Sequence, residues 1–486
     1  MLRPASVILW NPLTHGASGG DTSAVTSESD SADRISTVGQ QAATGFSKAV
    51  LEELDGSRSL PLRAMRETAF GQFETMPMPS PGTEEWRYTD LQDLDLSFAP
   101  YASEPAATSL DEVKPDLLEA AGEIGERAGL SIQHNSSVVV THVDPQAAGR
   151  GVMFTSLEEA TERHWHLVEP HLHRAVPTSR TRFTALHGAF RAGGTFVYVP
   201  RNVQVDLPLE TLTYVDREGL AVFPHTLIVL EEGAELTFID RYVSPDLDRV
   251  LSDAVVELFL GPGSKLRYVS LQDWGSGMTH LSVQRAILGR DAELRSLAVS
   301  FGGSLSRTEV ESVLEGDGGS SEMLGAYFAG ADQHFDHRSI QDHIGSQTAS
   351  DLLYKGALKD RSRTIYSGTV IIRKGAHKCD AYQTNRNVLL SEEAKADSIP
   401  NLEILSNDPV RCGHAASVGP VDEDVLYYMQ SRGIPYGEAE RLVVFGFFQE
   451  VLDRIPLPEI RSSLEATIAS QLGGAMDTDE GPIDVV

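Results

Sequence analysis

Cysteine is scarce in this sequence, because its 486 residues include only Cys379 and Cys412. Two thiols cannot form the disulfide framework of a small secreted domain, and so low a count is typical of a reducing compartment. No apolar run reaches the roughly 20 residues that a helix needs to cross a bilayer. The Ser/Thr-rich opening stretch carries Asp21, Glu28 and Asp30, which disfavours an organelle transit peptide. We therefore expect a cytoplasmic protein with no membrane contact.

Basic residues are also scarce, since 40 Lys and Arg stand against 70 Asp and Glu and give a formal net charge of −30. Such a field repels phosphate backbones, so we expect no nucleic-acid partner. The sequence has no Gly-x-x-x-x-Gly-Lys-Ser/Thr phosphate loop, no nucleophile elbow and no His-Glu-x-x-His helix. We therefore expect that the chain does not hydrolyse ATP itself and is not an enzyme.

A repeated phrase occupies the middle of the chain. Residues 228–236 (IVLEEGAEL) reappear as 258–266 (LFLGPGSKL) and as 286–294 (AILGRDAEL), with shorter-spaced copies at 370–376 and 389–394. The main spacing, roughly 28 to 30 residues, is typical of stacked supersecondary units. Strands this short bury their apolar faces only when coil stacks upon coil. The repeat predicts a mainly β fold with a right-handed parallel β-helix core. The alternative is a β-sandwich, which predicts turns roughly every 8 to 12 residues without a repeated phrase.

Helical patterns flank this β region. On the N-terminal side, Phe46, Val50, Leu51 and Leu54 recur at three- and four-residue steps, and a second helical pattern spans roughly 110–128. We expect α-helical domains at both ends. The regions are a disordered N-terminal extension (1–45), an N-terminal helical domain (46–135), the β-helix core (136–420), a C-terminal helical domain (421–472) and a flexible tail (473–486).

The C-terminal helices carry clear boundary signals. Asp422 is the expected N-cap of the first helix, Gly433 its C′ residue and Pro435 the stop. The next helix, about 436–454, is apolar on nearly all sides, which is typical of a helix that is buried or bound. It packs wholly against the β-helix, or it shares its surface between the β-helix and a partner.

The residues best suited to metal chemistry are Cys412 and His414, since a thiol and an imidazole two residues apart are good soft-metal ligands. Residue type alone leaves alternatives open, because structural metal sites normally supply four ligands. On residue type alone, the structural interpretation of His414 is favoured, and Cys412 is equally well explained as a small buried hydrophobe. Cys379 is interpreted as a core thiol.

A second constellation comprises His334, His337 and His343. If this strand is regular, His334 and His337 face opposite sides, so the structural interpretation is favoured over a transient metal role. Lys355 and Arg386 are expected at strand edges or caps, although such a pair of positive charges would also hold an anionic ligand.

The chain resembles the SufB/SufD family of iron–sulfur cluster assembly scaffolds. The resemblance is carried by residues 412–419 (CGHAASVG), 422–433 (DEDVLYYMQSRG) and 85–91 (EWRYTDL). It is dense from about 181 to 454, and it leaves out the first stretch to roughly 45 and the last dozen or so residues. The same resemblance implies a β-helix.

Two positions make the resemblance SufD-like. After the Asn-Arg-Asn phrase, the SufB branch is expected to carry a cysteine that receives persulfide sulfur, whereas this chain has Ser391. A hydroxyl cannot carry persulfide. The SufB branch is also expected to place an acidic ligand after the histidine of the second phrase, where Ala415 stands here.

The resemblance implies partners and a site. The chain is expected to pair with SufB through β-helix edges near its C-terminal coils and to bind the SufC ATPase through the helices after Val421. His414, together with Cys412, is expected to contact iron or a nascent iron–sulfur cluster shared transiently with SufB. Open questions are the complete ligand set, a homodimer when SufB is absent, and a flavin on the assembled complex.

Two rival functions remain at this point. A β-helix polysaccharide-active enzyme would place Asp or Glu side chains at one angular position over successive coils. An interaction module without metal contact would need the C-terminal helices but not His414.

Overall fold

The computed structural model describes residues 45–54, 60–122, 127–455 and 457–472 of the chain. The predicted disordered extension, apart from Gly45, and the predicted flexible tail 473–486 lie outside these residues. The described residues belong to one compact unit.

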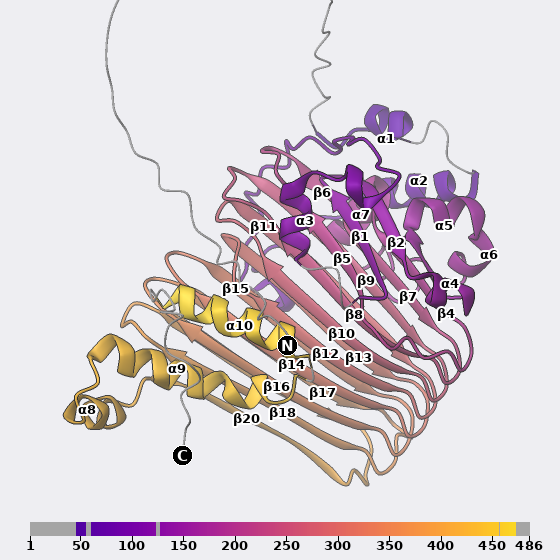
Figure 1. Ribbon diagram of the computed structural model, residues 1–486. Coiled ribbons are helices and arrows are strands. Elements are labelled where there is room, and N and C mark those ends of the chain that lie inside the picture. Colours follow the sequence, from indigo (N-terminus) through magenta and orange to yellow (C-terminus); the bar gives the residue numbers. More distant parts are fainter. Residues whose placement is uncertain (1–44, 55–59, 123–126, 456, 473–486) are drawn as a thin grey trace, which may run out of the picture. The chain divides into compact units, whose positions relative to one another are not determined.

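Two long β-sheets form the centre of this unit (Figure 1). Neighbouring strands are parallel except for one antiparallel pair at the N-terminal end of each sheet. In spatial order, sheet 1 contains β2 (Ser137–Val143), β1 (Gly129–His134), β5 (Leu209–Tyr214), β8 (Glu235–Val243), β10 (Lys265–Asp273), β12 (Glu293–Ser300), β14 (Ser320–Ala329), β16 (Ala349–Leu358), β18 (Asp380–Leu389) and β20 (Arg411–Pro420).

Sheet 2 runs beside sheet 1, and the chain alternates between the two sheets from β7 onward. In spatial order, sheet 2 contains β19 (Lys395–Ile404), β17 (Arg363–Ile372), β15 (His334–His343), β13 (Leu305–Leu314), β11 (Met278–Leu288), β9 (Val250–Leu260), β7 (His225–Leu230), β4 (Thr195–Val199) and β3 (Met153–Ser156), with β6 (Ala221–Val222) paired to β9. Alternation of this kind builds a parallel β-solenoid, which confirms the predicted β-helix.

The repeated phrase is the stacking unit. Leu258 pairs in register with Ile228 on one side and with Ala286 on the other. These three residues occupy one position of the phrase and are all buried in an aliphatic interior. The shorter-spaced copies have another origin, because Val370 lies in β17 of sheet 2 and Leu389 in β18 of sheet 1. They mark the two sides of a coil rather than successive coils.

Helices precede the solenoid and interrupt its first coils. A cluster of buried aromatic side chains joins them to sheet 2, including Phe70, Phe183, Phe190 and Phe223. The helices are α1 (Lys48–Leu54), α2 (Leu60–Thr75), the short 3-10 helices η1 (Glu84–Trp86) and η2 (Leu110–Glu112), α3 (Pro115–Ala121), α4 (Pro145–Gly149), α5 (Leu157–Arg163), α6 (Trp165–Val168) and α7 (Arg182–Phe190).

The helical pattern expected over 110–128 is divided. It forms η2 and α3, and α3 ends at Ala121. Strand β1 then begins at Gly129, inside the region expected to be helical, because every residue from Gly129 to His134 pairs with β5. Helices α4 to α7 lie inside the region expected to be β-helix. Sequence periodicity does not reveal such tertiary pairing.

Three helices follow the last strand: α8 (Glu423–Ser431), α9 (Tyr436–Leu452) and α10 (Pro458–Gln471). Asp422 caps α8 by accepting a hydrogen bond from the backbone N–H of Asp424, and Gly433 has a positive φ of 92°, as the boundary signals predict. Helices α9 and α10 cover the outer face of sheet 1 (Figure 1). Among the helices of the described residues, none combines the length and apolar character needed to traverse a membrane.

Candidate functional site

The two sheets end in open edges at their C-terminal side. Within the described part of the chain, no strand pairs with the outer edge of β19 or β20. Their side chains are mostly exposed or half-buried, in contrast to the buried strands before them. Pro400 lies within β19, where the missing N–H of proline is tolerated because the strand is at an edge. An unpaired edge of this kind is a template for a strand of another chain.

Cys412 and His414 lie on this edge, in β20. Cys412 pairs in register with Ala381 and His414 with Gln383, and both of these β18 residues are buried inside the coil. Side chains in register on parallel strands share a face. Cys412 and His414 therefore project toward the interior side of the last coil. His414 is nevertheless exposed, because no further coil covers it.

Cys412 is half-buried and packs against a small apolar cluster that includes Ile372, Cys379 and Ala381. Burial, with a smaller contribution from Cys379, raises the pKa of the Cys412 thiol. The thiol form is therefore favoured until a metal ion or another positive charge approaches. His414 offers a ring at the surface beside it.

The interior next to His414 is polar. Gln383 receives a hydrogen bond from Tyr366 Oη at 3.3 Å and donates from Nε2 to the carbonyl oxygen of Asn401 at 3.1 Å. Deeper in the same coils, Tyr327 Oη donates to Asn387 Oδ1 at 2.6 Å and accepts from Asn385 Nδ2 at 3.1 Å. Hydrogen-bonding groups thus continue inward from the position of His414.

The three histidines of the second predicted constellation, His334, His337 and His343, do not form one site. His334 contacts Thr89 Oγ1 at 3.1 Å, whereas His337 stacks on Tyr327 inside the coil with ring centroids 4.5 Å apart. These two rings therefore lie on opposite faces, as regular alternation predicts. His343 is six residues beyond His337 on the same strand, a separation of roughly 20 Å, and it contacts Thr348 Oγ1 and Ser350 Oγ. Burial lowers the pKa of both His337 and His343 to about 4, so both rings are neutral near pH 7.

The remaining candidates have structural roles. Cys379 is fully buried and contacts Thr348 Oγ1 at 3.3 Å, in agreement with a core thiol. Lys355 donates to the carbonyl oxygen of Phe447 at 2.8 Å and pairs with Glu450 at 2.7 Å. Lys355 lies in the middle of β16, which is paired on both sides, so the expectation of a strand-edge position is wrong. Its contacts hold α9 on sheet 1. Ser391 accepts a hydrogen bond from the backbone N–H of Asp360 in the neighbouring coil.

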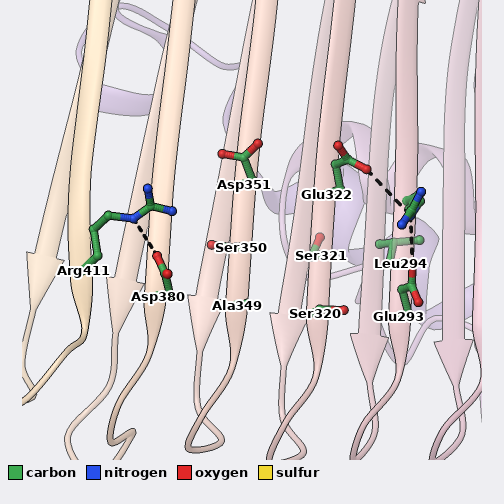
Figure 2. A pocket seen from close by; sticks show the side chains of 11 residues that line it. Glu293, Leu294, Ser320, Ser321, Glu322, Ala349, Ser350, Asp351, Asp380 and Arg411 are labelled. Atoms are coloured by element: carbon green, nitrogen blue, oxygen red, sulfur yellow. Dashed lines mark hydrogen bonds and ion pairs between the residues drawn. The ribbon is translucent and has the colours of Figure 1, made fainter. Parts of the chain in front are cut away.

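Sequence reasoning missed a row of acidic side chains on the outer face of sheet 1. Figure 2 shows Glu293, Glu322, Asp351 and Asp380 on neighbouring strands around a shallow pocket. Glu322 and Asp351 pair in register, whereas Glu293 and Asp380 are displaced along their strands. The only signal was their similar place in each repeat.

This row resembles the pattern expected of a polysaccharide-active enzyme, but its ion pairs argue against that chemistry. Arg411 lies 2.7 Å from Asp380 (Figure 2). Arg295 lies 2.9 Å from Glu293. Arg454 lies 2.7 Å from Asp351. A glycoside-cleaving pair needs one carboxyl group that is free to donate a proton to the leaving group, whereas these three carboxylates are engaged in ion pairs with arginines. The row is better explained as a charged face.

Comparison with known proteins shows which family the sequence of this chain matches. The family model "SUF system FeS cluster assembly, SufBD core domain" matches residues 213–447, and the model "SufBD protein N-terminal region" matches residues 126–211. The core match includes most strands of both sheets, the edge strands β19 and β20, and helix α8.

Curated relatives agree along most of the chain. Iron-sulfur cluster assembly protein SufD of Bacillus subtilis (strain 168) is 31% identical over 413 residues, which cover 84% of this chain and 93% of the relative. An iron-sulfur cluster assembly SufBD family protein of Staphylococcus saprophyticus is 27% identical over 426 residues, covering 85% of this chain and 90% of the relative. A SufBD family protein of Staphylococcus aureus (strain MRSA252) is 27% identical over 423 residues with the same coverage.

The chain therefore belongs to the SufBD family of iron–sulfur cluster assembly proteins, and the resemblance found in its sequence motifs is confirmed. Its similarity to the Bacillus subtilis SufD protein agrees with the SufD-like positions Ser391 and Ala415.

Proposed function

We propose that this chain is the SufD-type scaffold subunit of an iron–sulfur cluster assembly complex, and that His414, with Cys412, contacts iron or a nascent cluster. The observation that carries the proposal is the position of His414, exposed on the interior side of an unpaired edge strand. A coil supplied by a second chain would cover this ring and add the ligands that two residues cannot provide.

The second chain is proposed to be SufB. Its β-helix would continue the two sheets by pairing with β19 and β20, since parallel edges leave unpaired backbone N–H and C=O groups. Leu405 and Val410 flank these strands and are 58% and 69% exposed, so apolar surface is available at the same edge. A cluster at this junction would be shared between the two subunits.

Helix α8 is the proposed contact for the SufC ATPase. Val425, Tyr427 and Tyr428 on α8 and Tyr436 at the start of α9 are all exposed, with Tyr427 at 73%. Most of the apolar surface of α9 instead packs on sheet 1 through residues such as Val444 and Phe448. Exposed tyrosines are common anchors of protein interfaces. ATP hydrolysis on SufC would then move the two β-helices relative to each other and open the junction.

The test is cluster assembly on the reconstituted complex of this chain with SufB and SufC. His414→Ala should lower the iron content and the visible absorbance of the cluster, while complex formation on gel filtration is unchanged. Ser417→Ala is the matched control, because Ser417 is exposed on the same strand but projects to the opposite face.

Further variants separate the parts of the proposal. Cys412→Ser measures whether the thiol shares the ligand role of His414. Tyr427→Ser with Tyr428→Ser should release SufC and leave the pairing with SufB intact. Unchanged cluster yield in His414→Ala would reject the ligand role and favour an interaction module without metal contact.

A further inference from the structure

A second group of potential ligands lies far from the open edge, between sheet 2 and the loop that joins α6 to α7. His173 belongs to this loop, His225 begins β7, and Glu257 lies in β9. One potential ligand atom from each of the three residues lies within 4.8 Å of the others. No sequence pattern predicts this group, because its first and last members are 84 residues apart in the chain.

Glu257 is fixed in place. Its side chain is fully buried, and its two oxygens accept hydrogen bonds from the backbone N–H groups of His173, Ala175 and Val176 at 2.7, 2.8 and 2.9 Å. Arg285 lies in β11, in register with Glu257 of β9, and donates a hydrogen bond to the carbonyl oxygen of Ala175. The loop is therefore anchored to the sheet, and the carboxylate position does not depend on the surrounding imidazoles.

The imidazoles continue from Glu257 as a chain of short contacts. Glu257 Oε2 lies 3.1 Å from Nε2 of His225, and Nδ1 of His225 lies 3.0 Å from Nε2 of His187. Nδ1 of His187 lies 2.8 Å from the carbonyl oxygen of Asp253. Both rings are fully buried.

With neutral imidazoles, this series of three contacts has one hydrogen too few for three hydrogen bonds. Three hydrogen bonds need three hydrogens, whereas two neutral imidazoles supply one N–H each, and the terminal groups are a carbonyl and a carboxylate that only accept. One of the three contacts then brings two lone pairs together, which is unfavourable. The contact becomes favourable if the group holds one further positive charge. That charge is either a proton, most simply on Glu257, or a cation.

A cation between His225 and Glu257 removes the need for the third hydrogen. With the metal on Nε2 of His225, its Nδ1–H donates to His187, and the Nδ1–H of His187 donates to the carbonyl oxygen of Asp253. Each atom in the chain is then satisfied with neutral rings. Metal-binding histidines usually donate their second N–H to an acceptor in this way.

His173 supplies the third potential ligand atom of the group. Nδ1 of His173 is buried and has no hydrogen-bond partner among the described residues. The rings of His173 and His225 approach each other edge to face, with centroids 5.3 Å apart. Two imidazoles and one carboxylate form a set that borderline divalent ions such as Zn²⁺ and Fe²⁺ prefer. His173 is also partly exposed, which leaves a route from solvent.

We propose that His173, His225 and Glu257 bind one divalent transition-metal ion of the zinc or iron(II) class, with His187 orienting the ring of His225. The ion ties the α6–α7 loop to strands β7 and β9. Its role is therefore in the stability of the N-terminal coils, and the proposal does not depend on cluster assembly at His414.

The test uses the full chain, stripped of metal with a chelator and titrated with Zn²⁺ against a chromophoric competitor. The variants are His173→Ala and, as a matched control from the same loop, His171→Ala, whose ring packs on Phe259 outside the ligand set. Co²⁺ serves as a second probe, since its visible absorption reports the ligand field. An ion held by Cys412 and His414 would appear equally in all three proteins and cancels in the comparison.

The wild-type chain and His171→Ala should take up one more Zn²⁺ ion than His173→Ala, or bind it at least about ten-fold more tightly. Zn²⁺ should also raise the melting temperature of the first two proteins but not of His173→Ala. Equal uptake and equal melting shifts in all three proteins would overturn the proposal. So would an absence of Zn²⁺ and Co²⁺ binding in the wild type, which would assign the missing charge to a proton on Glu257.

Discussion

The two ends of the β-solenoid are finished in different ways. At the N-terminal end, each sheet closes with an antiparallel strand, and these strands, β2 and β3, contact each other. The backbone N–H of Ala107 donates to the carbonyl oxygen of Val139 in β2, and a helical layer buries aromatic side chains against sheet 2. At the C-terminal end, β19 and β20 stop with parallel edges that no described segment covers.

The interiors of the first and last coils also differ, in the polarity of their side chains. The first coils enclose a mostly aliphatic cluster that includes Ile228, Leu258 and Leu288. The last coils enclose tyrosine, asparagine and glutamine side chains that bond to one another. One end is thus sealed within the chain, whereas the edge strands at the other end have no further strand beside them among the described residues. Changes at the closed end should therefore affect folding, and changes at the open end should affect assembly.

The largest effect is expected at Asp336, where the N-terminal segment meets sheet 2. Its fully buried carboxylate pairs with Arg307 and Arg338 and accepts a hydrogen bond from Thr89 Oγ1 at 2.8 Å. The Arg307 guanidinium also lies 3.8 Å from the ring centroid of Trp86. Asp336→Asn removes the buried charge that Arg307 and Arg338 share and leaves Arg307 paired with Glu309 alone, so we expect a loss of about 3 kcal/mol in the free energy of unfolding.

Chemical denaturation of Asp336→Asn measures this loss. The matched control is Asp332→Asn, which removes the exposed ion pair with Arg361 and should leave the denaturation midpoint unchanged. Similar midpoints for the two variants would show that docking of the N-terminal segment on sheet 2 does not depend on this buried pair.

An intermediate effect is expected from Asp240, which is buried among the first coils. Burial raises the pKa of its carboxyl group to about 6, although hydrogen bonds from Tyr268, Thr226 and Tyr242 oppose the shift. The folded state therefore holds a proton that the unfolded state releases near pH 4. Stability from this group is full below pH 4 and is lost as the pH rises through 6, a change of about 3 kcal/mol.

Asp240→Asn keeps an oxygen that accepts the three hydroxyl hydrogen bonds but cannot ionise. The unfolding free energy of the variant should fall less steeply than that of the wild type between pH 4 and 7, as measured by urea denaturation at each pH. Parallel pH profiles for the two proteins would contradict the assignment of this proton to Asp240.

The smallest effect on stability is expected at the open edge. Val418 in β20 is 41% exposed, so Val418→Lys should change the free energy of unfolding by no more than about 0.5 kcal/mol. A charge on the proposed junction should nevertheless abolish co-purification with SufB. Val425→Lys on α8 is matched in residue type and exposure, at 42%, and should retain SufB. Loss of folding in Val418→Lys would show that the edge strand is needed for the stability of the single chain rather than for pairing with another chain.

Much of the architecture was predictable because the repeated phrase is local. A short apolar strand and a Gly- or Asp-bearing turn specify one coil, and their recurrence at 228–236, 258–266 and 286–294 specifies the stack. The caps of α8 were predictable for the same reason, since Asp422 and Gly433 act within a few residues of themselves. The start of β1 was not, because its strand character arises from pairing with β5, 80 residues away.

The candidate site was predictable only in part. The phrase around Cys412 and His414 identified the two residues, but their common face and their exposure follow from pairing with β18 and from the absence of a further coil. The group of His173, His225 and Glu257 had no sequence signal, since nothing in the spacing of its members distinguishes them from other buried polar residues.

The amino-acid sequence alone was enough to predict that this chain stacks as a β-solenoid, ends in helices and belongs with iron–sulfur cluster assembly proteins. These properties follow from repeats, caps and motifs whose information lies within short segments. The folded chain was needed to show which end of the solenoid is sealed, where His414 meets solvent, and which distant histidines and carboxylates come together. Proximity across sheets depends on how successive coils register, and no single coil encodes that register.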